Sequence, residues 1–208
     1  MRTAIRRSPA ARLSARLGAV FVEESGWEIP ASYGDDAAER AAIRDRVAIA
    51  DVTARAKVDV RGRLPEGLPL PTATVIARIS PGWVVVFGGP DAETRLLRAI
   101  EPVAGPGAMV TDVTHLFAGF ALAGPELPAV LERTTSWDPT TLAPGEATGA
   151  PIAEVRALMI RRDLDVPVLE VYVATEFARY VWETLSGVVA GLGGAPVGWQ
   201  ALRAEGWT

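Results

Sequence analysis

The sequence predicts an α+β fold, because predicted strands outnumber predicted helices and the helices are grouped together. A second observation is a repeated order of parts. On either side of the loop 102–107 (PVAGPG), a strand leads through a glycine into later helices and strands. A third is that 49% of the residues are hydrophobic, which is enough for a packed core. We therefore expect one domain over residues 1–208, built from two pseudo-repeated halves at approximately 8–104 and 105–208.

Composition narrows the function classes. The net charge is −4, whereas a protein that mainly binds nucleic acid usually presents a basic face, so no nucleic acid is expected as a partner. The chain has no cysteine, which excludes disulfides, thiolate catalysis and thiolate metal sites. No segment approaches the ~20 apolar residues that a membrane-spanning helix needs. We expect a cytoplasmic protein with no membrane partner.

The first half opens with two predicted helices. Ser8 before Pro9 suits the start of the first helix, and Gly18 ends it. Asp35 or Asp36 caps the second helix, which runs through residue 46. The side chains predicted to face the core from this second helix are Ala41, Ile43 and Val47.

Strands dominate the rest of the first half. Residues 57–60 alternate charged and apolar side chains, which is typical of a half-buried strand. Residues 73–79 and 83–87 form two strands joined by a Pro-Gly turn. The second of these reads WVVVF, too continuously apolar for a sheet edge that faces water. A Gly-Gly-Pro turn then leads into a helix at 91–100, with Asp91 as its cap.

The second half repeats this pattern. Its predicted strands are residues 109–113, 119–122, 152–160 and 169–173. Its predicted helices are residues 125–132, 176–189 and 197–207, the second of them capped by Thr175. Residues 136–150 are rich in proline and glycine, and are predicted to form a long turn region.

Several short motifs follow one another in a fixed order between residues 8 and 62. A helix runs into an apolar strand, then a G-W-E-I-P-x-x-Y loop at 26–33, a charged helix, I-A-D-V at 49–52 and K-V-D-V-R-G at 57–62. This series resembles the opening of the folate-dependent aminomethyltransferase family, whose founding member is the glycine cleavage T protein. Two later segments, TDVTHLFAGFALAGP at 111–125 and LEVYVATE at 169–176, also resemble segments of that family.

The resemblance covers most of residues 8–200 and is weakest between 64 and 107. It implies tandem ferredoxin-like halves, as in the folate-binding domain of aminomethyltransferases, without the C-terminal β-barrel with which the family's enzymes continue. It also implies a function linked to tetrahydrofolate-dependent one-carbon transfer or amine demethylation. A partner chain is then expected to complete the ring that surrounds the cofactor.

The family's site residues match only in part. An aspartate in a hairpin activates the folate amine, but residues 72–87 contain no carboxylate here, so no catalytic residue is assigned and enzymatic activity stays open. A glutamate on a Y-E-L-Y-V strand binds the pterin of tetrahydrofolate, and Glu170 matches it. Glu170 is therefore the predicted cofactor-binding residue, although strand alternation also allows it to point outward. The glycine-tyrosine motif before that strand reads RRDLDVP at 161–167, and the family's later arginine matches Gln200.

Two further segments, LERTTSWDPTTL at 131–142 and FARYVWE at 177–183, are more similar to the γ subunit of heterotetrameric sarcosine oxidase. That resemblance implies a non-catalytic structural subunit of a sarcosine-oxidase-type or demethylase complex. A stand-alone folate sensor is a third hypothesis. The expected partners are folate and either another protein chain or a second copy of this one.

Other candidate sites have weaker support. His115 is the only histidine, and a turn or strand-edge role suits it better than catalysis. Asp35 and Asp36 suit a helix cap better than a metal pair, so no metal is expected. The six tryptophans are predicted to be core or interface anchors, because no basic stripe accompanies them.

Overall fold

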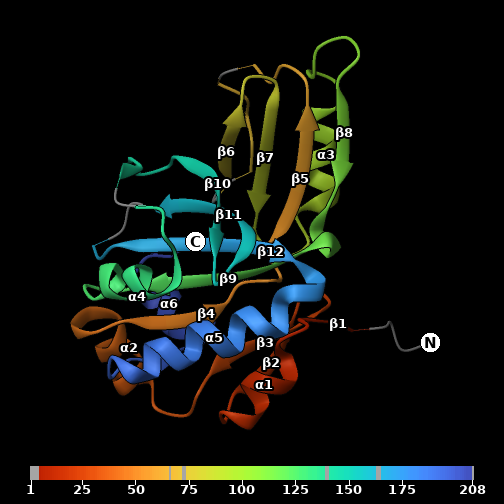
Figure 1. Cartoon of the computed structure of the whole chain (residues 1–208). Helices are drawn as coiled ribbons and strands as arrows, with labels where there is room; N and C mark the ends of the chain where they lie inside the picture. Colours follow the sequence, from red (N-terminus) through yellow and green to blue (C-terminus); the bar gives the residue numbers. More distant parts are fainter. Residues whose placement is uncertain (1–4, 66, 72–73, 139–140, 163–164, 208) are drawn as a thin grey trace.

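The structure is a computed structural model that describes residues 5–65, 67–71, 74–138, 141–162 and 165–207. Within these residues the strands form three sheets (Figure 1). The smallest contains β1 (Arg6–Arg7), β3 (Trp27–Ser32) and β2 (Val20–Glu24), in that order. No helix in the described ranges is long and apolar enough to cross a membrane.

The prediction of a loop at 26–33 is wrong, because most of this motif is strand β3. Trp27, Ile29 and Ala31 are buried on one face of the strand, so the motif has the alternation of a half-buried strand. Pro30 is tolerated because β1 pairs only with Trp27 and Glu28, which leaves that edge of β3 without a ladder at the proline.

Two helices accompany the small sheet. These are α1 (Ala11–Arg16) and α2 (Asp36–Asp45). The predicted cap of α2 is confirmed, since an Asp35 carboxylate oxygen accepts a hydrogen bond from the Ala38 N–H at 3.0 Å. Ala42 and Ile43 face the core from this helix, whereas Ala41, which was predicted to do so, is exposed.

The largest sheet has six strands. In spatial order they are β10 (Ala147–Ile152), β11 (Val155–Arg162), β12 (Val168–Ala174), β9 (Phe117–Ala123), β4 (Ala48–Asp51) and β13 (Ala195–Pro196). The predicted pairing of β11 with β12 is confirmed as antiparallel. Strand β10 was predicted to lie within a turn region. Its position at the sheet edge explains how Gly149 and Pro151 are accommodated.

Helices cover both faces of the six-stranded sheet. On one face, α4 (Leu127–Thr134) and α5 (Ala178–Gly191) bury side chains from β9 and β12, among them Phe120 and Val171. A short 3₁₀ turn, η3 (Thr175–Phe177), leads into α5. On the other face, α2 and α6 (Trp199–Ala204) pack against Ala121 and Val168. The central strands β4 and β9 therefore place alternate residues in two different cores.

The third sheet has four strands and stands at the top of the molecule in Figure 1. Its order is β6 (Val75–Ser80), β7 (Trp83–Gly88), β5 (Ala56–Arg61) and β8 (Met109–Asp112). The apolar strand β7 lies inside the sheet, as its sequence predicts. Helix α3 (Glu93–Ile100) covers one face. Asp91 does not cap α3 as predicted, since Ala92 is the capping residue and Asp91 has a φ of +62°.

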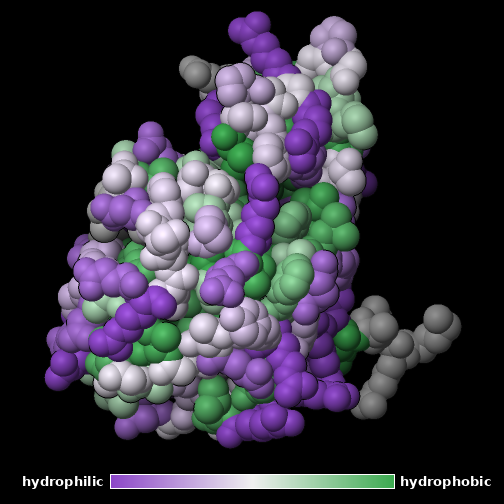
Figure 2. Space-filling view, viewed as in Figure 1, coloured by the Kyte–Doolittle hydropathy of each residue, from purple (hydrophilic) through white to green (hydrophobic). Residues whose placement is uncertain are grey.

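The two larger sheets are joined by a small apolar cluster. Phe87 of β7 packs on Tyr172 of β12 with ring centroids 4.4 Å apart. Figure 2 shows apolar side chains gathered at the seam where the four-stranded sheet meets the rest of the molecule. Sheet membership crosses the middle of the sequence, because β4 joins strands of the second half and β8 joins strands of the first. The predicted division into halves at 8–104 and 105–208 stays a prediction.

Candidate functional site

Glu170, the predicted cofactor-binding residue, is completely buried. The alternative that it points outward is therefore wrong. Along β12, Leu169, Val171 and Val173 face the core under α4 and α5, so Glu170 points to the opposite face of the sheet. The alternation of the strand thus places a carboxylate inside the protein, where it must find hydrogen-bond donors.

Among the described residues, four side chains donate to this carboxylate. One guanidinium nitrogen of Arg55 contacts both oxygens, at 2.8 and 3.0 Å. Arg162 donates to Oε1 at 2.7 Å and the Trp207 indole donates to the same oxygen at 3.0 Å. The Tyr172 hydroxyl donates to Oε2 at 2.6 Å. Because a carboxylate offers about four lone-pair positions, the acceptor capacity of Glu170 is fully used.

These donors come from distant parts of the sequence. Arg55 lies just before β5, Arg162 ends β11, and Trp207 follows α6. Tyr172 is two residues along β12 from Glu170, on the same face, and its ring is accommodated by Gly119 of β9. A Cβ at Gly119 would lie 2.5 Å from the Tyr172 ring. The Arg55 guanidinium also lies 5.2 Å from the ring centroid of Trp207, which adds a cation–π contact.

The electrostatics of this network favour a permanently charged pair. Burial opposes ionisation of Glu170, but Arg55 and Arg162 outweigh it and lower the pKa of the carboxyl group. Burial and the adjacent Glu170 charge raise the pKa of Tyr172 well above its ordinary value, so its hydroxyl stays protonated and donates. The Glu170 carboxylate and the Arg55 guanidinium are both inaccessible to water, with side-chain exposures of 0% and 1%.

A second buried charge lies beside this network. The Lys57 ammonium donates to the backbone carbonyl oxygens of Thr53 and Arg55 at 2.9 and 2.8 Å. Burial and the nearby Arg55 lower the pKa of Lys57 to about 7. Asp51 of β4 is also buried, and its pKa is raised, mainly by burial. The sequence predicts only a half-buried strand at 57–60, and Asp51 was used only as part of the I-A-D-V motif at 49–52, so both charges were missed as core groups.

The other sequence candidates do not join the Glu170 site. Asp91 is largely exposed, at 70% of its side chain, and Gln200 is exposed on α6. His115 lies in a 3₁₀ turn, η1 (Thr114–Leu116), and stacks on Trp27 at 5.5 Å. The described residues include no group of three or more His, Cys, Asp or Glu side chains placed to hold a metal ion.

Known proteins provide an independent comparison. The sequence is 26% identical to an aminomethyltransferase from Streptomyces coelicolor, over 94% of this chain and 60% of that protein. It is 29% identical to one from Rubrobacter xylanophilus, over 68% of this chain and 45% of that protein. No family model matches the chain.

The fold agrees with the sequence comparison. The structure superposes on glycine cleavage system aminomethyltransferase T from Bartonella henselae with a TM-score of 0.79 and 16% identity, over 97% of this chain and 62% of that one. The chain resembles the aminomethyltransferase family. A chain of heterotetrameric sarcosine oxidase from a Corynebacterium species superposes with a TM-score of 0.65 and 19% identity, over 91% of this chain and 97% of that one. This aminomethyltransferase-like chain thus spans about 60% of the length of the first curated relatives and almost all of one sarcosine oxidase chain.

Tetrahydrofolate, the cofactor that the resemblance implies, does not fit the residues around Glu170. The carboxylate that would accept hydrogen bonds from a pterin already accepts them from Arg55, Arg162, Tyr172 and Trp207. The hairpin of β6 and β7 carries no carboxylate in its described residues, 74–88. The segment 161–167, which replaces a glycine-tyrosine motif of the family, lies partly outside the described residues. In this aminomethyltransferase-like chain the site is built as an internal ion-pair network.

Proposed function

We propose that this chain is a non-catalytic structural subunit of a complex that carries out amine oxidation, demethylation or one-carbon transfer, with the chemistry performed by a partner chain. The observation that carries the proposal is the self-contained Glu170 network. Its carboxylate is bound by a guanidinium of the same chain, so its hydrogen-bonding capacity serves the fold. A cytoplasmic location goes with this function.

The partner is inferred from the relatives. One structural neighbour is a chain of a heterotetrameric sarcosine oxidase, and the superposition covers nearly that whole chain. The curated relatives are named aminomethyltransferases, which indicates one-carbon chemistry as the setting. A subunit of this size, built on the same fold, suits a role beside a chain that holds the reacting groups.

A second candidate function is a folate-binding domain that itself takes part in one-carbon transfer. The observation that favours it is the place of Glu170 on β12, within the segment that matches the pterin-binding strand of the family. For a pterin to bind there, the Arg55 guanidinium and the Trp207 indole would both have to leave the carboxylate. The role of Glu170 in binding tetrahydrofolate stays a prediction.

Calorimetric titration with tetrahydrofolate separates the two functions. The purified wild-type chain and the Glu170→Gln variant are titrated side by side, with thermal unfolding of both as the control for folding. The glutamine keeps the shape of the side chain, while its amide loses the negative charge and has an NH2 donor in place of one acceptor oxygen. We expect no saturable heat from the wild type, and no aminomethyl-transfer activity from the isolated chain.

Two outcomes would contradict the proposal. Saturable binding to the wild type that is lost in Glu170→Gln would establish the folate-binding function at Glu170. Saturable binding that survives in Glu170→Gln would locate a folate site elsewhere in the chain.

In the absence of binding, co-purification with cross-linking in the source organism should recover one partner chain in a fixed stoichiometry.

A further inference from the structure

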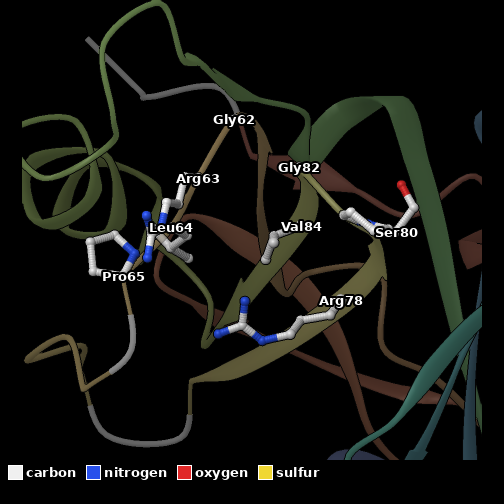
Figure 3. A pocket seen from close by; sticks show the side chains of 9 residues that line it. Gly62, Arg63, Leu64, Pro65, Arg78, Ser80, Gly82 and Val84 are labelled. Carbon is white, nitrogen blue, oxygen red and sulfur yellow. The ribbon is translucent and has the colours of Figure 1, made fainter.

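A cavity of about 930 Å³ lies at the outer end of the four-stranded sheet. It opens between the loop that follows β5 and the hairpin that joins β6 to β7 (Figure 3). A cavity of this size accommodates a small organic molecule. The described residues that line it are Gly62, Arg63, Leu64, Pro65, Arg78, Ser80, Pro81, Gly82 and Val84.

The cavity exists because the helix covers this face of the sheet incompletely. Helix α3 packs on β5, β7 and β8. The loop after β5 covers part of the remaining surface, with Leu64, Leu68 and Leu70 packed on the same apolar cluster as α3. Between this loop and the hairpin, Val84 of β7 forms an apolar floor that neither element fills.

Two arginines form the polar part of the cavity. Arg63 follows β5, and Arg78 is on β6. Figure 3 shows the Arg78 side chain extending across the opening towards the segment that contains Arg63 and Leu64. Within the described part of the chain neither guanidinium group has an ion-pair or hydrogen-bond partner, and no described residue of the lining is acidic.

We propose that this cavity binds a small organic dianion, a phosphate monoester or a dicarboxylate with a compact apolar body. The planar guanidinium group matches the geometry of carboxylate and phosphate oxygens. Because the two guanidinium groups carry two positive charges, a ligand with two negative charges would neutralise both. The apolar floor and the prolines at the rim supply the contact for the carbon skeleton. The lining includes none of the residues that contact Glu170, and the inference does not depend on the proposed function.

The test uses phenyl phosphate and phthalate as organic probes, and inorganic phosphate as the probe that lacks an apolar body. Each is titrated into the ¹⁵N-labelled full chain while the arginine Nε–Hε resonances are followed by NMR. We expect saturable shifts of the Arg63 and Arg78 resonances with at least one organic probe. Inorganic phosphate should bind at least about tenfold more weakly, because it makes no contact with the floor.

Variants separate a built site from general charge attraction. Arg63→Gln and Arg78→Gln should each weaken binding of the organic probe by about tenfold or more, because each removes charge-assisted hydrogen bonds to the ligand. The matched control is Arg156→Gln, which removes the same charge from an exposed position on β11 and should leave the affinity unchanged. Binding of phenyl phosphate alone would indicate a phosphate monoester as the ligand, and binding of phthalate alone would indicate a dicarboxylate.

Three results would overturn the proposal. The first is no saturable shift with either organic probe. The second is an equal loss of affinity in all three variants, which would indicate attraction by net charge alone. The third is inorganic phosphate binding as tightly as the organic probes, which would remove the role of the apolar floor.

Discussion

Two pairs of arginines in this chain differ in whether a carboxylate of the chain lies beside them. Arg55 and Arg162 share the buried carboxylate of Glu170, and their charges are matched inside the protein. Arg63 and Arg78 line an open cavity in which no described residue is acidic. A guanidinium stays charged at any pH relevant to a protein, so its role is decided by where the counter-charge comes from. The first pair stabilises the fold, because the chain itself supplies the anion. The second pair is available to bind the anionic ligand that we propose.

Removal of Glu170 tests most directly whether the buried arginines serve the fold. Glu170→Ala leaves two guanidinium groups without their shared carboxylate in a dry interior. We expect a loss of about 3–5 kcal/mol in the free energy of unfolding, measured by urea denaturation. The control is Glu183→Ala on α5, an exposed residue paired with Arg179, for which a loss of under about 1 kcal/mol is expected.

A loss below about 1 kcal/mol for Glu170→Ala would show that water or a rearrangement satisfies the arginines. The site would then be open enough to admit a ligand, and the proposed structural role would fail. If Glu170→Ala does not fold at all, Glu170→Gln provides the measurement, because it keeps the packing and removes the charge.

Lys57 is a further buried cation, and none of the described carboxylates forms an ion pair with it. Its pKa of about 7 lies below the ordinary value of 10.5, so between pH 7 and 10.5 the unfolded chain holds more protons than the folded chain. The free energy of unfolding should therefore rise with pH, by about 2 kcal/mol between pH 7 and 9. Lys57→Met should abolish this rise, as measured by urea denaturation across that range. An unchanged pH dependence in the variant would assign the rise to other groups.

The predictions from sequence succeed for the fold where local pattern decides the outcome. The Asp35 cap, the paired strands β11 and β12, and the interior place of the apolar strand β7 all follow from short-range patterns. Strand β3, which contains Pro30, was predicted as a loop, and most of β10, which contains Pro151, lies in the proline- and glycine-rich region 136–150 that was predicted as a turn. Both prolines are tolerated only because a sheet edge lies beside them, and the position of an edge depends on long-range pairing.

The site was less predictable than the fold, because it depends even more on long-range packing. Glu170 was singled out by resemblance, but its surroundings were not predictable. Arg55 and Glu170 are separated by 115 positions, and Trp207 and Glu170 by 37. No periodicity links them, since they meet only when β5, β12 and the segment after α6 pack together. The burial of Lys57 was missed for the same reason, because the alternation of β5 does not reveal that Tyr172 of β12 packs nearby, with its ring centroid 5.5 Å from the Lys57 Nζ.

The smallest expected effect concerns the open pair. Arg63→Gln and Arg78→Gln break no intramolecular ion pair in the described structure and create no cavity in the core. Each should change the free energy of unfolding by no more than about 0.5 kcal/mol in urea denaturation without ligand. With a saturating organic probe the wild type should gain stability by mass action, and the variants should gain less. A loss above about 1 kcal/mol without ligand would mean that these arginines are already satisfied by the chain. In that case the two pairs would differ in exposure only, and the distinction between structural and ligand-binding arginines in this molecule would fail.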